Sequence, residues 1–99
     1  MYRLRIAPSA SDELARVPVF YRRVIEEAIE KHLGHEPDKG SRNRKRLQPL
    51  VAGFEHEEPL WELRTGEWRV FYDVDTEART VVIRAVRKKP KHQRTEEIL

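Results

Sequence analysis

Hydrophobic and polar positions follow two different periods along this 99-residue chain. Tyr2, Leu4 and Ile6 alternate with polar residues, and a period of two is typical of a half-buried strand. From residue 19 to residue 33 the apolar positions recur at helical spacing, which predicts an amphipathic helix with Gly34 as its terminator. A shorter helix is expected before it, capped by Ser9 and stopped by Pro18.

The segment from Trp61 to Tyr72 predicts a tight β-hairpin. Two runs of strand-favouring residues flank Gly66-Glu67, and a two-residue loop with glycine first closes such hairpins. In this register Arg64 faces Arg69 on one face, and the other face is expected to meet the core. The predicted core residues are Trp61, Leu63, Val70 and Tyr72. Like charges that face each other across strands are destabilising, so the arginine pair indicates an anion bound between them.

Residues 35–59 are interrupted by prolines and glycines and are expected to be a long loop that is either functional or contains a short helical turn. Its apolar residues are expected to anchor it to the core; they are Leu47, Leu50, Val51 and Phe54. A further strand is predicted over residues 80–86 and a last helical turn over residues 95–99. The order β-α-α-β-β-β predicts a single α+β domain over residues 1–99, with two N-terminal helices on one face of a small, mostly antiparallel sheet.

Composition narrows the class of protein. The chain has no cysteine, no apolar run near the ~20 residues that span a bilayer, and no segment typical of a signal peptide, so we expect a cytoplasmic protein without a membrane partner. The net charge is only +3, but residues 39–46 hold five bases and residues 84–94 hold six, with no acid in either run. These runs favour a polyanionic partner; the alternative is a solvated, solubilising surface.

The sheet face that the helices leave open is expected to carry the chemistry. Regular alternation places these residues on it: Glu62, Arg64, Arg69, Phe71, Val82, Arg84, Val86 and Lys88. Cations hold phosphates and an aromatic ring stacks on an unpaired base, so this surface suits RNA. The residues expected to bind RNA are Arg84, Arg87, Lys45, Arg46 and Phe71. The alternative is that Arg64 and Arg69 form ordinary surface ion pairs with Glu62 and Asp73.

The hairpin also carries a family resemblance. The pattern Leu-Arg-x-Gly-x-Trp-Arg-Val-Phe-Tyr over residues 63–72, the turn with Asp73 and Asp75, and the strand ending Ala-Val-Arg-Lys-Lys at residue 89 resemble the RelE/ParE superfamily of bacterial toxins. The first nine residues resemble that superfamily's first strand and helix entry. The resemblance implies the RelE-like fold and a toxin of a type II toxin–antitoxin system. RelE-like members cut messenger RNA on the ribosome, whereas ParE-like members inhibit DNA gyrase.

The resemblance also implies roles for individual residues. Arg69 matches the superfamily's hairpin arginine and is the candidate for stabilising the scissile phosphate, with Arg64 beside it; Lys88 and Lys89 lie where RelE-like toxins carry basic residues. The chain has Glu62 on the strand face where RelE has a lysine, and Thr95 near the position of RelE's C-terminal tyrosine. A glutamate base with a C-terminal histidine resembles the YoeB-like branch. The candidates for these roles are Glu62, one of Glu55, Glu57 and Glu58, and His92.

The expected partners follow from the same resemblance: a cognate antitoxin, and either the ribosome with messenger RNA or DNA gyrase. Operator DNA is expected to be bound only through the antitoxin. No cofactor is expected, and no metal, because His32 and His35 have no third ligand placed by the sequence. Three functions stay open at this point: a messenger RNA endonuclease, a gyrase inhibitor or inactive toxin, and a non-toxic nucleic-acid-binding module.

Overall fold

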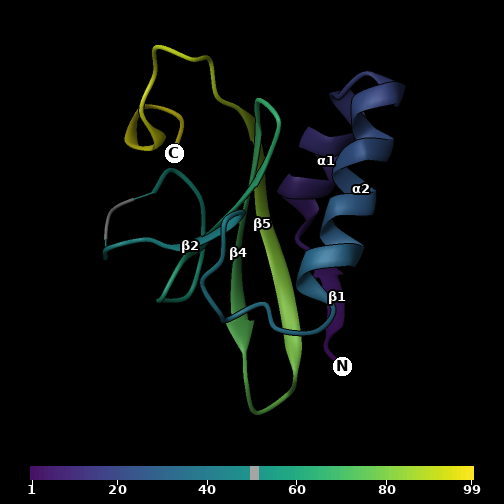
Figure 1. The fold of residues 1–99 in the computed structure, drawn as a ribbon, viewed down its shortest axis with the longest axis vertical. Helices are drawn as coiled ribbons and strands as arrows, with labels where there is room; N and C mark the ends of the chain where they lie inside the picture. Colours follow the sequence, from purple (N-terminus) through teal and green to yellow (C-terminus); the bar gives the residue numbers. More distant parts are fainter. Residues whose placement is uncertain (50–51) are drawn as a thin grey trace.

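The computed structural model of the protein describes residues 1–49 and 52–99. Two helices lie on one face of a five-stranded sheet, so the predicted α+β class is confirmed (Figure 1). In chain order the elements are β1 (Arg3–Ile6), α1 (Pro8–Arg16), α2 (Val19–Leu33), β2 (Arg44–Arg46), β3 (Trp61–Thr65), β4 (Trp68–Asp75), β5 (Thr80–Lys88) and a single 3₁₀ turn η1 (Thr95–Glu97). The strands are ordered β1-β5-β4-β3-β2 across the sheet, with β1 parallel to β5 and the other pairs antiparallel.

Strand β2 is the element that the sequence did not predict. The expectation that residues 35–59 form only a loop or a helical turn was wrong at Arg44–Arg46, because this segment pairs with β3 and extends the sheet by one edge strand. Three consecutive basic residues show no alternation of hydrophobicity, so the strand depends on pairing with β3 rather than on its own pattern. Of the four expected anchors, Leu47 is buried and Phe54 partly buried; Leu50 and Val51 lie outside the described residues.

The helices begin and end near the predicted residues. α2 spans the predicted range, but α1 begins at Pro8 after Ala7, and no side chain caps it, so the predicted Ser9 cap was wrong. Proline suits the first helical position because its missing N–H would have no partner there. Ile25, Ile29 and Leu33 are buried, whereas Tyr21 and Val24, which the helical spacing placed on the same face, are 48% and 41% exposed.

The hairpin has the predicted register. Arg64 pairs with Arg69 and Thr65 with Trp68, around the Gly66-Glu67 turn. Gly66 has a φ of 61°, a left-handed conformation that glycine adopts without steric strain. The residues expected on the core face (Trp61, Leu63, Val70 and Tyr72) all join the core beneath the helices.

A β-bulge in β5 changes which side chains reach the open face. Phe71 pairs with Ala85 and Tyr72 with Ile83, so Arg84 is an extra residue in β5 and the alternation reverses after it. Val86 therefore packs in the core beneath the helices, and Lys88 lies beside Trp68 and Tyr21 on that same side. The expectation that Val86 and Lys88 share the open face with Arg69 was wrong.

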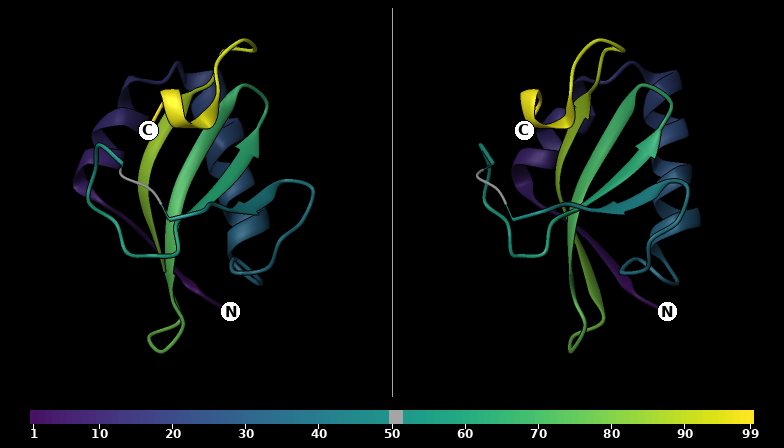
Figure 2. Two further views of the ribbon diagram at one scale, coloured as in Figure 1. Left: turned by 90° about the vertical axis from the view of Figure 1, so that its left-hand side faces the viewer. Right: turned by 60° about the vertical axis from the view of Figure 1, so that its left-hand side comes forward.

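A second, smaller core covers part of the open face. Phe71 is fully buried there with Leu47, Leu60 and Ala85, and Phe54, Ile98 and Leu99 pack against this cluster. Figure 2 shows the segment after residue 52 and the C-terminal segment on the side of the sheet opposite the helices. The prediction that Phe71 presents an exposed ring to RNA was wrong, because the C-terminal segment covers it.

Tyr72 links the sheet to the segment after α2, and it gives a prediction about pH. Its buried hydroxyl donates a hydrogen bond of 2.6 Å to the carbonyl oxygen of Pro37. Burial raises the pKa of Tyr72 well above its usual value of 10.0, while Arg44 lowers it to a smaller extent and Asp38 adds to the rise. The phenol therefore stabilises the fold below about pH 10, and this contribution is lost as the pH rises, because the unfolded chain releases the proton first.

We expect the free energy of unfolding to fall above about pH 10 more steeply for the wild type than for Tyr72→Phe. The difference in slope should approach about 1.4 kcal/mol per pH unit. Urea unfolding followed at a series of pH values measures it. Parallel pH dependences for the two proteins would show that the phenol titrates normally.

Candidate functional site

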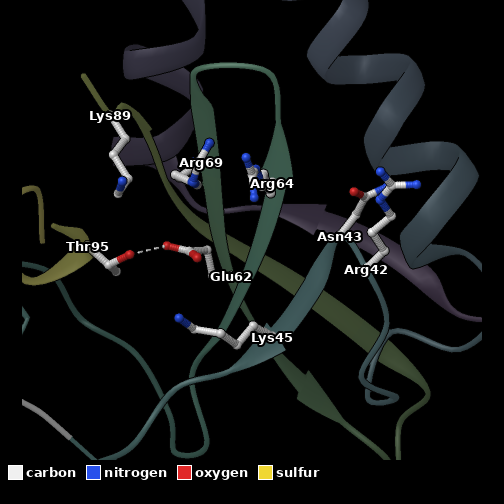
Figure 3. A pocket seen from close by; sticks show the side chains of 8 residues that line it. All are labelled: Arg42, Asn43, Lys45, Glu62, Arg64, Arg69, Lys89 and Thr95. Atoms are coloured by element: carbon white, nitrogen blue, oxygen red, sulfur yellow. Dashed lines mark hydrogen bonds between the residues drawn. The ribbon is translucent and has the colours of Figure 1, made fainter. Parts of the chain in front are cut away.

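A pocket of about 210 Å³ opens on the face of the sheet away from the helices. Five cations, one carboxylate and two neutral polar side chains line it: Arg42, Asn43, Lys45, Glu62, Arg64, Arg69, Lys89 and Thr95. The close-up in Figure 3 shows Lys45 and Lys89 extending toward the Glu62 carboxylate from opposite sides, with Arg64 and Arg69 side by side on the hairpin. The pocket is therefore strongly cationic with a single acid at its centre.

Adjacent strands supply the pocket's central side chains. Glu62 and Arg64 lie two residues apart on β3 and so share a face, while Arg69 pairs with Arg64 from β4. Lys45 pairs with Glu62 from β2, and the backbone N–H of Lys89, just past β5, donates to the carbonyl oxygen of Glu67. The missed strand β2 thus forms one wall of the site.

Arg69 is a buried arginine that turns back onto the hairpin loop. It is only 7% exposed, and its Nη1 donates to the carbonyl oxygens of Gly66 at 2.8 Å and Trp68 at 2.9 Å. Burial lowers the pKa of Arg69 from its usual value; Glu62 opposes this effect and Arg64 adds to it. Two backbone bonds fix the guanidinium in place, and within the described chain no carboxylate forms an ion pair with it. Such a pre-positioned charge suits an anionic ligand.

Glu62 is a buried carboxylate among cations. It is 6% exposed, and its Oε2 accepts a hydrogen bond of 2.8 Å from the hydroxyl of Thr95. Asp73, the other acid considered as a partner for the hairpin arginines, instead pairs with Arg84 at 2.7 Å. The alternative of surface ion pairs for Arg64 and Arg69 is therefore wrong for the part of the chain that the structure describes.

Several predicted site residues lie outside the pocket. Arg84 is paired with Asp73, and Arg87 is paired with Glu13 at 2.7 Å. Lys88 lies on the helix side of the sheet, and Arg46 lines a neighbouring hollow with Lys45 and Arg94. His92 is exposed and does not line the pocket, and among the glutamates of the loop Glu58 contacts His56 at 2.8 Å. Thus Arg64, Arg69, Glu62, Lys89 and Lys45 are brought together, and the others are not.

Three pocket residues were not predicted. Arg42 and Asn43 belong to the basic run before Leu47, but their position depends on the unpredicted strand β2. Thr95 was noted only as a replacement for a tyrosine, and its approach to Glu62 spans 33 positions in sequence. No local pattern encodes such a contact, because the packing of the C-terminal segment determines it.

The arrangement fits the binding of a phosphate diester. Several cations stabilise negative charge on phosphate oxygens, and one buried carboxylate can accept a proton from a hydroxyl group. In the described residues no group of three or more His, Asp or Glu side chains could hold a metal ion. None of the helices described is long and apolar enough to cross a membrane.

Comparisons with solved structures agree with this fold. The toxin–antitoxin complex RelBE2 from Mycobacterium tuberculosis contains a chain 28% identical to this one, with a TM-score of 0.69 and coverage of 89% of this chain and 98% of that chain. The archaeal RelE–RelB complex from Pyrococcus horikoshii has a chain that is 21% identical to this one, with a TM-score of 0.69 and coverage of 91% of this chain and 97% of that chain. The isolated RelE toxin of E. coli is 17% identical to this chain, with a TM-score of 0.71 and coverage of 98% of this chain and 94% of that chain. Comparison with curated proteins gave no match.

The chain shares its fold with these solved RelE toxin and toxin–antitoxin structures. A family model described as the ParE toxin of the type II toxin–antitoxin system parDE matches residues 4–91, and the chain belongs to that family.

Proposed function

We propose that this toxin is a ribosome-dependent endonuclease that cuts messenger RNA without a metal cofactor. One observation carries the proposal: a buried carboxylate and a buried arginine lie in the same cationic pocket, and neither forms an ion pair with any residue of 1–49 or 52–99. Burying charges without partners destabilises a protein, so an arrangement of this kind favours a role in ligand binding or catalysis.

The proposed reaction is attack by a ribose 2′-hydroxyl on the adjacent phosphate. Glu62 removes the proton of the 2′-hydroxyl, a bond forms between that oxygen and phosphorus, and the bond from phosphorus to the 5′ oxygen breaks. The products are a 2′,3′-cyclic phosphate and a 5′-hydroxyl end. Arg69 and Arg64 stabilise the charge that develops on the phosphate. Lys45 and Lys89 line the same pocket and are the groups able to supply a proton to the departing oxygen.

A second candidate is inhibition of DNA gyrase, which the match to the ParE family model favours. In that case the pocket would be a binding surface, and no acid–base chemistry would be required of Glu62. The two functions therefore differ in whether Glu62 must act as a base.

The proposed partners are a cognate antitoxin and, for the endonuclease, messenger RNA on the ribosome. The Mycobacterium tuberculosis and Pyrococcus horikoshii structures are toxin complexes with RelB, which supports an antitoxin for this chain as well. An antitoxin segment that carries acids would neutralise the cationic pocket. Contact with operator DNA would then occur only through the antitoxin.

Incubation of the purified chain with ribosomes that hold a defined message tests the proposal. The message should be cut to give a 5′-hydroxyl end, and replacing the 2′-hydroxyl at the cut nucleotide by hydrogen should abolish the cut. Messages left intact, together with inhibition of gyrase supercoiling by the same preparation, would establish the second candidate instead.

A further inference from the structure

The C-terminal segment touches the site through one hydroxyl group. Thr95 lies at the first residue of η1, and its Oγ1 donates a hydrogen bond of 2.8 Å to Oε2 of Glu62 (Figure 3). Among the described residues no other hydrogen bond or ion pair to the Glu62 carboxylate is formed. This single donor therefore distinguishes the two carboxylate oxygens.

Packing determines where this hydroxyl lies. Ile98 and Leu99 pack against the cluster that contains Phe71, and Arg87 donates from its Nη1 to the carbonyl oxygen of Ile98 at 2.9 Å. Within the turn, the backbone N–H of Arg94 donates to Oε1 of Glu97 at 2.9 Å. The residues after Thr95 are thus held to the sheet and the turn around Thr95 is closed by its own hydrogen bond, which places the hydroxyl beside Glu62.

We propose that Thr95 is a positioning residue that orients the Glu62 carboxylate for proton abstraction. With Oε2 held by Thr95, Oε1 is the oxygen left to accept the proton of the attacking hydroxyl. The inference rests on the proposed function, because it assigns Glu62 the role of base.

The test compares Thr95→Val, which keeps the size of the side chain and removes the hydroxyl, with Thr95→Ser, which restores a hydroxyl. Thr76→Val is a matched control, because Thr76 is exposed in the turn between β4 and β5. In Thr95→Val the single-turnover rate of message cleavage should fall about tenfold, because the carboxylate is no longer held in one orientation, while a 2′-deoxy message on the ribosome should bind with the wild-type affinity. Thr95→Ser and Thr76→Val should keep the wild-type rate and affinity. A purely structural role would change the folded fraction without lowering the rate per folded molecule.

A second measurement keeps this inference separate from the proposed function. High-resolution crystal structures of the wild type and of Thr95→Val compare the orientation of the Glu62 side chain. The carboxylate should adopt one orientation in the wild type and more than one in Thr95→Val, whether or not the wild type cuts RNA. If the wild type cuts no message but the orientation is lost in Thr95→Val, the endonuclease proposal fails and the positioning role of Thr95 remains. An unchanged Glu62 orientation or a wild-type cleavage rate in Thr95→Val would overturn the role of Thr95.

Discussion

Arg69→Ala should lower the rate of message cleavage by about 10²–10³, since losing one charge-stabilising donor has an effect of that size in other active sites. Arg69 is held by Gly66 and Trp68 and is buried, so the alanine variant also loses two hydrogen bonds within the hairpin. That loss should lower the free energy of unfolding by about 1–3 kcal/mol. The cleavage rate is therefore expressed per folded molecule, with the folded fraction taken from circular dichroism.

Arg69→Lys should restore only part of the activity. Lysine keeps the charge but cannot hold two phosphate oxygens with a planar fork. Arg23→Ala on the outer face of α2 is the matched control, because Arg23 is exposed and remote from the pocket, and its cleavage rate should equal that of the wild type. If folded Arg69→Ala cuts at the wild-type rate, Arg69 stabilises the hairpin and has no role in catalysis.

Glu62→Gln should lower the cleavage rate by about 10²–10⁴, the range attributed to general acid–base catalysis. Glutamine has the same shape and can still accept the hydrogen bond of Thr95, but it does not take up a proton at neutral pH. The variant should bind a 2′-deoxy message on the ribosome at least as tightly as the wild type, because one negative charge leaves a cationic pocket.

This combination of slow chemistry and unimpaired binding separates a base from a binding group. Single-turnover cleavage and binding of the 2′-deoxy message measure the two steps. Glu27→Gln, an exposed change on α2, should alter neither. Full activity in Glu62→Gln would assign the proton abstraction to another group and leave Glu62 as a buried partner of Thr95.

Much of the fold could be predicted because its periodicities are clear. The spacing of apolar residues in α2 and the glycine-first turn at Gly66 each specify one local structure, and the core face of the hairpin followed from register alone. Pairing Arg64 with Arg69 also located the centre of the pocket.

The unpredicted parts depend on contacts distant in sequence. Strand β2 forms because it pairs with the edge of β3. Its three residues are all basic, so they show no alternation of apolar and polar residues that would predict a strand. The bulge at Arg84 could not be predicted from the pattern of apolar residues. The strand residues next to Arg84 are apolar on both faces of the sheet, so shifting the register by one residue exchanges one apolar side chain for another in each core. That shift removed Lys88 from the site, and the C-terminal segment buried Phe71 and brought in Thr95.

The central claim is that the pocket cuts messenger RNA, and mapping of message 5′ ends in translating ribosomes after induction of the toxin tests it most directly. Cells expressing the wild-type chain should stop growing and accumulate new 5′ ends at the codon in the ribosomal A site. Cells expressing equal amounts of folded Glu62→Gln should show neither effect. Growth arrest with intact messages, while plasmid DNA loses its negative supercoils or becomes linear, would contradict the account and identify gyrase as the target.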